Sequence, residues 1–368
     1  MISRRRFLGG SAAVLAATAL RRTALAAKPR LPRVNVAPDR VIRIITGLRP
    51  FRPAGFCVRA EKLDEKLVVH NYGHGGAGIT LSWGTGLLAV REAAAVEARD
   101  CAVLGCGVNG LTTARLLQQR GYNPTIYAKE MPPGVTSNVA GGLWEPVSLF
   151  DHASVTPAFA AQFAEAARLA FQRYQSLAGD YYGVRWLPLY TLAQDAAAVA
   201  APPPDSPNNP IDTLYPENSL LNRHEHPFNV PFVRRRDSML IEPAIYLNAL
   251  IRDFELAGGR IVIREFHSAR ELAALRESLI FNCTGLGART LFADSTMMPI
   301  KGQLVFLLPQ PEIDYMTIGP NGIYMFPRHD GILLGGSFER GNENTEIEPA
   351  VTERILHDNG ALFGGMRG

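Results

Sequence analysis

The stretch Ala102-Val103-Leu104-Gly105-Cys106-Gly107-Val108-Asn109-Gly110 decides the fold, because it places a G-x-G-x-x-G pattern directly after an apolar segment. Gly105 permits a tight turn, Gly107 lets a pyrophosphate approach the backbone, and Gly110 allows a helix to pack closely on a strand. Val108 is a further contact candidate, since the N-terminus of the next helix offers unpaired N–H groups to phosphates. The pattern predicts a dinucleotide site, and its spacing alone fits NAD as well as FAD.

The neighbouring residues predict a β-α-β unit around this pattern. Residues 101–104 and 124–127 read as strands, and residues 111–120 as an amphipathic helix that Gly121 ends. The second strand of such a unit usually ends in an acidic residue that binds ribose. Lys129 takes that place here and Glu130 follows it, so Lys129 becomes the candidate cofactor contact.

Periodicity predicts further elements along the chain. Helices are expected over 87–98, 156–178 and 243–257, and strands over 41–46, 260–264 and 279–283. Alternation over 303–338 predicts antiparallel strands. Segments 47–55, 70–86 and 201–210 are predicted to be loops.

Composition limits the classes of protein. With 368 residues and 47% apolar content, the chain can form one large domain or two joined ones. The formal charge of +4 includes five arginines in the first 26 residues, and the remainder carries −1. A nearly neutral chain lacks the positive charge that general nucleic-acid binding requires. Cys57, Cys101, Cys106 and Cys283 are too few for a disulfide scaffold and form no metal-binding pattern, so we expect buried apolar fillers.

The N-terminus reads as a twin-arginine export signal. Ser3-Arg4-Arg5-Arg6-Phe7-Leu8 is followed by a small apolar run to Leu20 and by Ala24-Leu25-Ala26, which is typical of a cleavage site. The run is shorter than the ~20 residues of a membrane span. We therefore expect a signal peptide over 1–26, a linker over 27–40, the twin-arginine machinery as a partner, and a protein that is periplasmic or secreted with no stable membrane span.

Further segments resemble the D-amino acid oxidase family of FAD-dependent enzymes. They are 47–53 (GLRPFRP), 70–80 (HNYGHGGAGIT), 136–146 (TSNVAGGLWEP), 281–288 (FNCTGLGA), 299–303 (PIKGQ) and 334–338 (LGGSF). The resemblance implies FAD as cofactor, with the glycine loop of 70–80 around the isoalloxazine ring. It also implies cofactor contacts at Gly75, Gly76, Gly78, Ile79, Thr80, Thr136, Ser137, Gly141, Gly142, Leu143, Phe266, Thr284 and Gly285.

The resemblance also implies substrate contacts. Arg49 would grip the substrate carboxylate through its planar guanidinium, with Gly76 beside the reacting atoms, whereas Arg52 is expected to be an ordinary solvated side chain. Phe228 and Phe232 appear where the family has two tyrosines that close over the substrate. Glu145 replaces a common glutamine, which would repel acidic substrates or favour one with a second amine. The run Arg234-Arg235-Arg236 could offset this charge, although such a run is usually a solvated face.

Together these features predict an α/β fold in which a Rossmann-like FAD-binding domain is interleaved with an antiparallel-sheet substrate domain. The FAD-binding parts are expected at 65–150 and 258–300, and the substrate parts at 41–64, 151–257 and 301–368. The expected reaction is oxidative deamination of D-amino acids by hydride transfer to flavin N5, with molecular oxygen as acceptor and 2-oxo acid, ammonia and hydrogen peroxide as products. Two alternatives stay open: a flavin enzyme for glycine, sarcosine or another secondary amine, and a non-catalytic FAD-binding protein. A homodimer also stays open.

The order of the segments is unusual. In the resembling family the arginine segment and the His-Asn-Tyr-Gly loop come near the C-terminus, whereas here both precede the glycine pattern. Joining the old termini and opening new ones elsewhere would explain this order, because chain ends often lie close together at a domain surface. The sequence therefore predicts a circular permutation.

Overall fold

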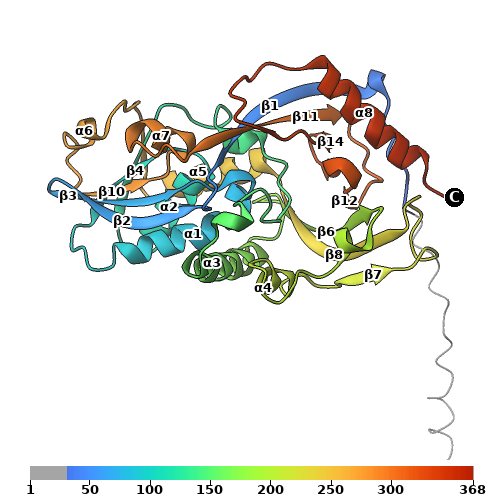
Figure 1. The fold of residues 1–368 in the computed structure, drawn as a ribbon. Helices are drawn as coiled ribbons and strands as arrows, with labels where there is room; N and C mark the ends of the chain where they lie inside the picture. Colours follow the sequence, from blue (N-terminus) through green and yellow to red (C-terminus); the bar gives the residue numbers. More distant parts are fainter. Residues whose placement is uncertain (1–30, 368) are drawn as a thin grey trace, which may run out of the picture.

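Two β-sheets lie side by side in the computed structural model, which describes residues 31–367 (Figure 1). The six-stranded sheet is parallel except for its edge strand β2. In spatial order its strands are β2 (Cys57–Leu63), β3 (Lys66–Tyr72), β10 (Leu279–Asn282), β4 (Asp100–Leu104), β5 (Asn123–Ala128) and β9 (Arg260–Ile263).

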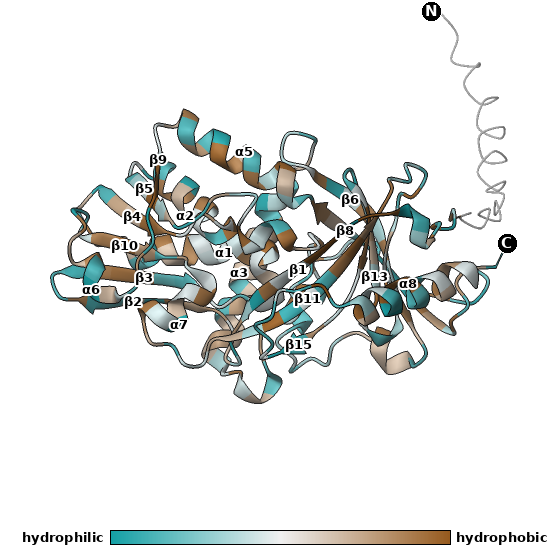
Figure 2. Ribbon diagram, turned by 90° about the horizontal axis from the view of Figure 1, so that it is seen from above, coloured by the Kyte–Doolittle hydropathy of each residue, from teal (hydrophilic) through white to brown (hydrophobic). Residues whose placement is uncertain are grey.

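The nine-stranded sheet is mostly antiparallel, with β12 parallel to β6. In spatial order its strands are β1 (Val41–Phe51), β11 (Met298–Leu307), β14 (Gly331–Gly335), β13 (Tyr324–Arg328), β12 (Met316–Ile318), β6 (Val184–Ala193), β8 (Phe232–Ile241) and β7 (Ser219–Leu221), and β15 (Glu339–Arg340) also pairs with β11. Figure 2 shows hydrophobic segments along the strands of both sheets, and mixed colours on the helices that cover them.

Helices cover both sheets. The α-helices are α1 (Gly78–Glu92), α2 (Val108–Gln118), α3 (Pro157–Ser176), α4 (Asn209–Asp212), α5 (Pro243–Leu256), α6 (Ala269–Leu272), α7 (Ala288–Leu291) and α8 (Pro349–Gly364). Short 3-10 helices are η1 (Pro38–Arg40), η2 (Gly75–Ala77), η3 (Thr136–Val139), η4 (His152–Ser154), η5 (Ala196–Val199), η6 (Gly285–Gly287) and η7 (Pro320–Gly322). Helix α1 contacts α2 and α3, α2 contacts α5, and α8 contacts β11 and β14 of the larger sheet.

Most periodic elements agree with the sequence. The strands predicted at 101–104, 124–127, 260–264 and 279–283 are confirmed as β4, β5, β9 and β10, and the helices at 156–178 and 243–257 as α3 and α5. Antiparallel strands within 303–338 are confirmed as well. The segment 201–210 is irregular up to Asn208, and α4 begins at Asn209.

Three boundaries were wrong because tertiary contacts overrode local composition. Strand β1 continues through the predicted loop at 47–55 as far as Phe51, since β11 pairs with it throughout. Helix α1 runs from Gly78 to Glu92 rather than over 87–98, because its glycines allow other helices to approach closely. Helix α2 begins at Val108, three residues before the predicted start, with Gly107 at its N-cap.

The predicted FAD-binding and substrate parts do not coincide with the two sheets. Strand β2 belongs to the six-stranded sheet, although residues 41–64 were predicted in the substrate part. Helices α3 and α5, predicted in the same part, share a core cluster with α1, α2 and β4. The parallel and the antiparallel sheet are therefore both present, but the segments that build and cover each sheet alternate along the chain more often than the sequence indicated.

The described residues of the linker, 31–40, are packed against the C-terminal region. Val34 is buried in a cluster with Ile355 and Phe363 of α8, and the Arg33 guanidinium donates to the carbonyl oxygen of Met366. The two ends of the described chain are thus neighbours (Figure 1). The predicted signal peptide and residues 27–30 lie outside the described residues.

Two absences concern the part of the chain that the structure describes. Within residues 31–367 there is no helix with the length and apolar character of a membrane span, and no group of side chains suited to a metal ion. The four cysteines are free and buried as predicted, and burial raises the pKa of Cys101, Cys106 and Cys283 to about 12.

The contact between α1 and α3 depends on Gly84. A Cβ at Gly84 would lie 1.9 Å from the carbonyl oxygen of Ala166. We expect Gly84→Ala to lower the free energy of unfolding by about 2 kcal/mol or more, because the helices would have to separate. Gly360→Ala in α8 is the control, because the nearest atom to a Cβ at this position would be 3.9 Å away. The higher helix propensity of alanine should raise the free energy of unfolding of this variant by about 0.5 to 1 kcal/mol. Thermal unfolding measures both, and equal melting temperatures would contradict the close contact.

Candidate functional site

The glycine pattern forms the turn that the sequence predicted between β4 and α2. Gly105 has φ +103°, and a Cβ there would lie 2.7 Å from the carbonyl oxygen of Cys283. A Cβ at Gly110 would lie 1.9 Å from the oxygen of Gly105. The turn therefore requires glycine at both positions, and it brings the N-terminus of α2 to the carboxyl edge of the parallel sheet, where nucleotides bind in such folds.

The glycine loop of 70–80 places a second helix N-terminus at the same point. Because α1 begins at Gly78, Ile79 and Thr80 lie in its first turn, and a Cβ at Gly78 would lie 4.0 Å from Val108 Cγ1. Gly75 and Gly76 lie in η2, just before α1. The positive ends of two helix dipoles thus converge, which favours negative charge between the loop and the glycine turn.

His74 links the loop to the glycine turn. The Asn109 Nδ2 group lies 3.2 Å from His74 Nδ1, and His74 Nε2 lies 3.0 Å from the Thr85 hydroxyl. Nδ1 is assigned as the acceptor because Asn109 offers it a donor, so Nε2 carries the proton. Complete burial lowers the pKa of His74 to about 3, which keeps the ring neutral.

The segment 136–146 joins these two loops to the larger sheet. The Val108 N–H donates to Ser137 Oγ at 3.0 Å, and the Thr80 hydroxyl donates to the carbonyl oxygen of Glu145 at 3.1 Å. Gly142 has φ +93°, and its Cβ would lie 2.1 Å from the Ile241 oxygen in β8. A Cβ at Gly141 would lie 3.0 Å from the Phe326 ring. Thr136 and Leu143 lie on this same segment.

The remaining predicted cofactor contacts lie at the same edge of the parallel sheet. Thr284 and Gly285 follow β10, and the Thr284 hydroxyl donates to Asn282 Oδ1 at 2.7 Å. Lys129 is exposed directly after β5. Phe266 follows β9 and packs edge-on against Tyr127, with 6.0 Å between ring centroids. The glycine turn and the two helix N-termini form a cradle in which a Cβ at Gly107 would meet only Ser137 Oγ, at 3.2 Å. A phosphate can therefore approach the backbone there, and these residues fit a dinucleotide such as FAD.

Arg49 lies flat against the backbone of β11. A Cβ at Gly302 would lie 2.4 Å from Arg49 Nη1, so the guanidinium occupies the space that a side chain would need. Nη1 makes long hydrogen bonds of 3.4 Å to the carbonyl oxygens of Lys301 and Ser337. Pro50 and Phe51, which follow Arg49, lie next to the cofactor cradle. A Cβ built at Gly75 would lie 3.2 Å from the Phe51 ring, and one built at Gly285 would lie 3.8 Å from Pro50.

Tyr324 accompanies Arg49, although no sequence motif indicated it. Burial raises the pKa of the Tyr324 hydroxyl, while the neighbouring Arg49 guanidinium acts in the opposite direction. A Cβ at Gly335 would lie 2.1 Å from the Tyr324 ring. Two glycines, Gly302 and Gly335, thus leave room for the two polar groups. Tyr324 pairs with Gly335 of the LGGSF segment, but this pairing is known only from the structure.

The structure does not support the proposed role of Phe228 and Phe232. Phe228 is fully buried in a core cluster with Tyr190 and Tyr315, so it cannot close over a substrate. Phe232 is the first residue of β8 and is 39% exposed opposite Ala193.

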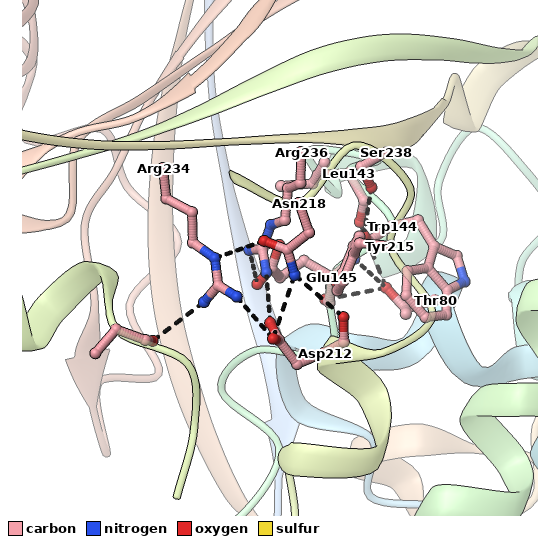
Figure 3. Close-up of polar contacts among 11 residues, drawn as sticks. Thr80, Leu143, Trp144, Glu145, Asp212, Tyr215, Asn218, Arg234, Arg236 and Ser238 are labelled. Carbon is pink, nitrogen blue, oxygen red and sulfur yellow. Dashed lines mark hydrogen bonds and ion pairs between the residues drawn. The ribbon is translucent and has the colours of Figure 1, made fainter. Parts of the chain in front are cut away.

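Glu145 lies in a network of charged groups that the sequence only partly indicated (Figure 3). Arg236 Nη2 lies 2.5 and 2.6 Å from the two carboxylate oxygens of Glu145. Of the two readings that the arginine run left open, Arg236 takes the one that offsets the Glu145 charge, and it is 8% exposed. Arg52, which was expected in solvent, is partly buried and donates to Asp294 Oδ2 at 3.1 Å.

A cavity of about 420 Å³ adjoins this network. Its lining includes Glu145, Ser148, Thr191, Arg236 and Ile318. Ser148 also accepts a hydrogen bond from the Gly76 N–H at 3.0 Å. The cavity is therefore in contact with the glycine loop that precedes α1.

Comparisons with known proteins agree with this geometry. Residues 100–367 match the model of the DAO family, described as FAD dependent oxidoreductase. The chain is 30% identical over 273 residues to a D-amino-acid oxidase of Rubrobacter xylanophilus, covering 72% of this chain and 78% of the relative. It is 28% identical to a D-amino-acid oxidase of Streptomyces coelicolor, with coverage of 72% and 77%. A glycine oxidase structure from Geobacillus kaustophilus shares the fold, with TM-score 0.54, 16% identity and coverage of 73% and 80%.

The buried neutral His74 makes stability depend on pH. In the unfolded chain a histidine binds a proton below about pH 6.5, whereas folded His74 does so only near pH 3. The neutral His74 ring therefore contributes fully to the free energy of unfolding above about pH 6.5, and this contribution is lost as the pH falls below that value. When the pH is lowered from about 7 to about 4.5, the free energy of unfolding measured in urea should fall by about 2 to 3 kcal/mol more for wild type than for His74→Gln. His357→Gln, at an exposed site, is the control, and identical losses in all three proteins would refute the assignment.

Proposed function

Because this chain belongs to the DAO family of FAD-dependent oxidoreductases, we propose that it oxidises D-amino acids with molecular oxygen. In the balanced reaction, a D-amino acid, oxygen and water give a 2-oxo acid, ammonia and hydrogen peroxide. The observation that carries the proposal is the Arg49 and Tyr324 pair, held over glycines beside the cofactor cradle. FAD, when bound, supplies the redox chemistry.

In this proposal the side chains act mainly by positioning. Arg49 binds the substrate carboxylate through two parallel N–H groups, and the Tyr324 hydroxyl donates a further hydrogen bond to it. A carboxylate fixed in this way orients Cα toward the glycine loop. Gly76 offers no side chain that would obstruct the substrate, and a Cβ there would lie 2.8 Å from the Val147 oxygen. We assign no general base, because positioning accounts for the chemistry.

We also propose that the chain is circularly permuted. Strands β1 to β3 and helix α1 precede residue 100, where the family match begins, yet β1 pairs with β11 and β3 pairs with β10. An unpermuted chain would pass from α8 into β1. The packing of residues 31–36 on α8, with Val36 Cγ1 3.9 Å from a Cβ built at Gly360, supports new ends near that connection.

The catalytic proposal predicts which substrates reduce the flavin. After anaerobic mixing with a panel of D- and L-amino acids, we expect loss of flavin absorbance with D-amino acids only. Arg49→Ala should lower kcat/KM at least a hundredfold, since a charged hydrogen-bonded pair with the carboxylate is lost. Arg52→Ala is the matched control from the same segment and should retain reduction. Reduction by glycine or sarcosine in place of D-amino acids would favour the secondary-amine alternative, and a flavin that nothing reduces would favour the non-catalytic one.

The signal at 1–26 predicts export by the twin-arginine route. Replacing Arg4 and Arg5 by lysine keeps the charge but removes the recognised pair. In a bacterial host with this pathway, we expect cleaved wild-type protein in the periplasmic fraction and uncleaved variant in the cytoplasm. Equal export of both proteins would refute the assignment.

A further inference from the structure

The cavity beside Glu145 lies on the same face of the larger sheet as Tyr324. Tyr324 is paired with Ile318 in β12, Ile318 with Thr191 in β6, and Thr191 with Arg234 in β8. Paired residues on neighbouring strands project to one face and lie about 5 Å apart. Ile318 and Thr191 line the cavity, so it opens one strand away from the tyrosine that accompanies Arg49.

The polar wall of the cavity is balanced in charge. Besides the exposed His152, its charged lining residues are Glu145, Asp212, Arg234 and Arg236. Arg236 pairs with Glu145, and Arg234 Nη2 donates to Asp212 Oδ2 at 2.7 Å (Figure 3). Two positive and two negative charges thus neutralise each other.

The internal contacts hold these groups in place. Arg234 also donates to Asn218 Oδ1 at 2.7 Å and to the Ala200 oxygen at 3.1 Å. The Arg236 guanidinium lies 4.2 Å from the centre of the Tyr215 ring. Burial would lower the pKa of Arg236, but Glu145, Tyr215 and Asp212 outweigh it, so the arginine stays charged. A charged ligand would have to compete with partners already fixed in position.

We propose that this cavity receives the substrate side chain and selects uncharged side chains, with the Glu145–Arg236 pair as the specificity determinant. The inference rests on the proposed function, since Arg49 sets where the carboxylate lies. The pair excludes both kinds of charge: Arg236 cancels the attraction of Glu145 for an ammonium group, and Glu145 cancels the attraction of Arg236 for a carboxylate. Removing either partner leaves the wall with one net charge.

Binding of five-carbon acids tests the proposal without any reaction. Valerate, glutarate and 5-aminovalerate share one carboxylate and differ only at the far end, and flavin absorbance changes give their dissociation constants. We expect wild type to bind valerate at least tenfold more tightly than the other two. Glu145→Gln should improve glutarate binding relative to valerate at least tenfold, and Arg236→Gln should do so for 5-aminovalerate.

Turnover gives a second readout. The same variants should raise kcat/KM for D-glutamate and for D-lysine, respectively, relative to D-glutamine. Arg235→Gln is the matched control, because Arg235 lies on the same strand, is paired with Tyr190 on the opposite face, and contacts Asp237. Its ratios should stay within twofold of wild type. If Arg236→Gln does not fold, two other variants still test the proposal. Glu145→Gln should improve glutarate binding relative to valerate, and the neutral double variant Glu145→Gln/Arg236→Gln should improve it less.

The outcomes separate the two proposals. Unchanged ratios in both single variants, or a wild type that prefers glutarate or 5-aminovalerate, would overturn the selection of uncharged side chains while D-amino acids still reduce the flavin. If none of the acids binds and no D-amino acid reduces the flavin, the proposed function fails and this inference fails with it.

Discussion

The antiparallel ladder between β1 and β11 is the constraint on which the site depends. It pairs residues from Val41 with Leu307 to Phe51 with Met298, and it fixes Arg49 against Gly302. The end of β1 then reaches the cofactor cradle through Pro50 and Phe51. Because a shift of one residue turns every side chain to the opposite face, this register determines whether the guanidinium faces the site at all.

The sequence was sufficient wherever local physics determined the structure. The β-α-β unit followed from apolar strands, a helical period and three glycines, and it was confirmed. Residues 47–51 and 78–86 were predicted as loops because they are rich in glycine or proline. Their true conformations depend on remote partners, since β11 pairs with the first segment and Ala166 packs on Gly84 in the second. No local pattern records those contacts.

The candidate site divides in the same way. Arg49 and Glu145 could be named because motifs carry them. The structure places Glu145 beside Thr80 of the glycine loop, and Arg49 two residues before Phe51, whose ring lies near Gly75 of that loop. Tyr324 could not be found by spacing, since its neighbour Arg49 lies in a segment remote in sequence. For the arginine run 234–236 the sequence left two alternatives open, a solvated face or a partner for the Glu145 charge. In a strand, alternate side chains point to opposite faces, so Arg236 is buried while Arg235 is half-buried on the other side.

The position of β1 has a consequence for synthesis. Arg49 and its contact Lys301 are 252 residues apart, so at about 5 to 20 residues per second the ribosome completes β1 roughly ten to fifty seconds before its partner. During that interval an apolar strand has no neighbour and is open to wrong pairing. A chain that makes this strand first therefore depends more on chaperones during translation than one in which both strands emerge together.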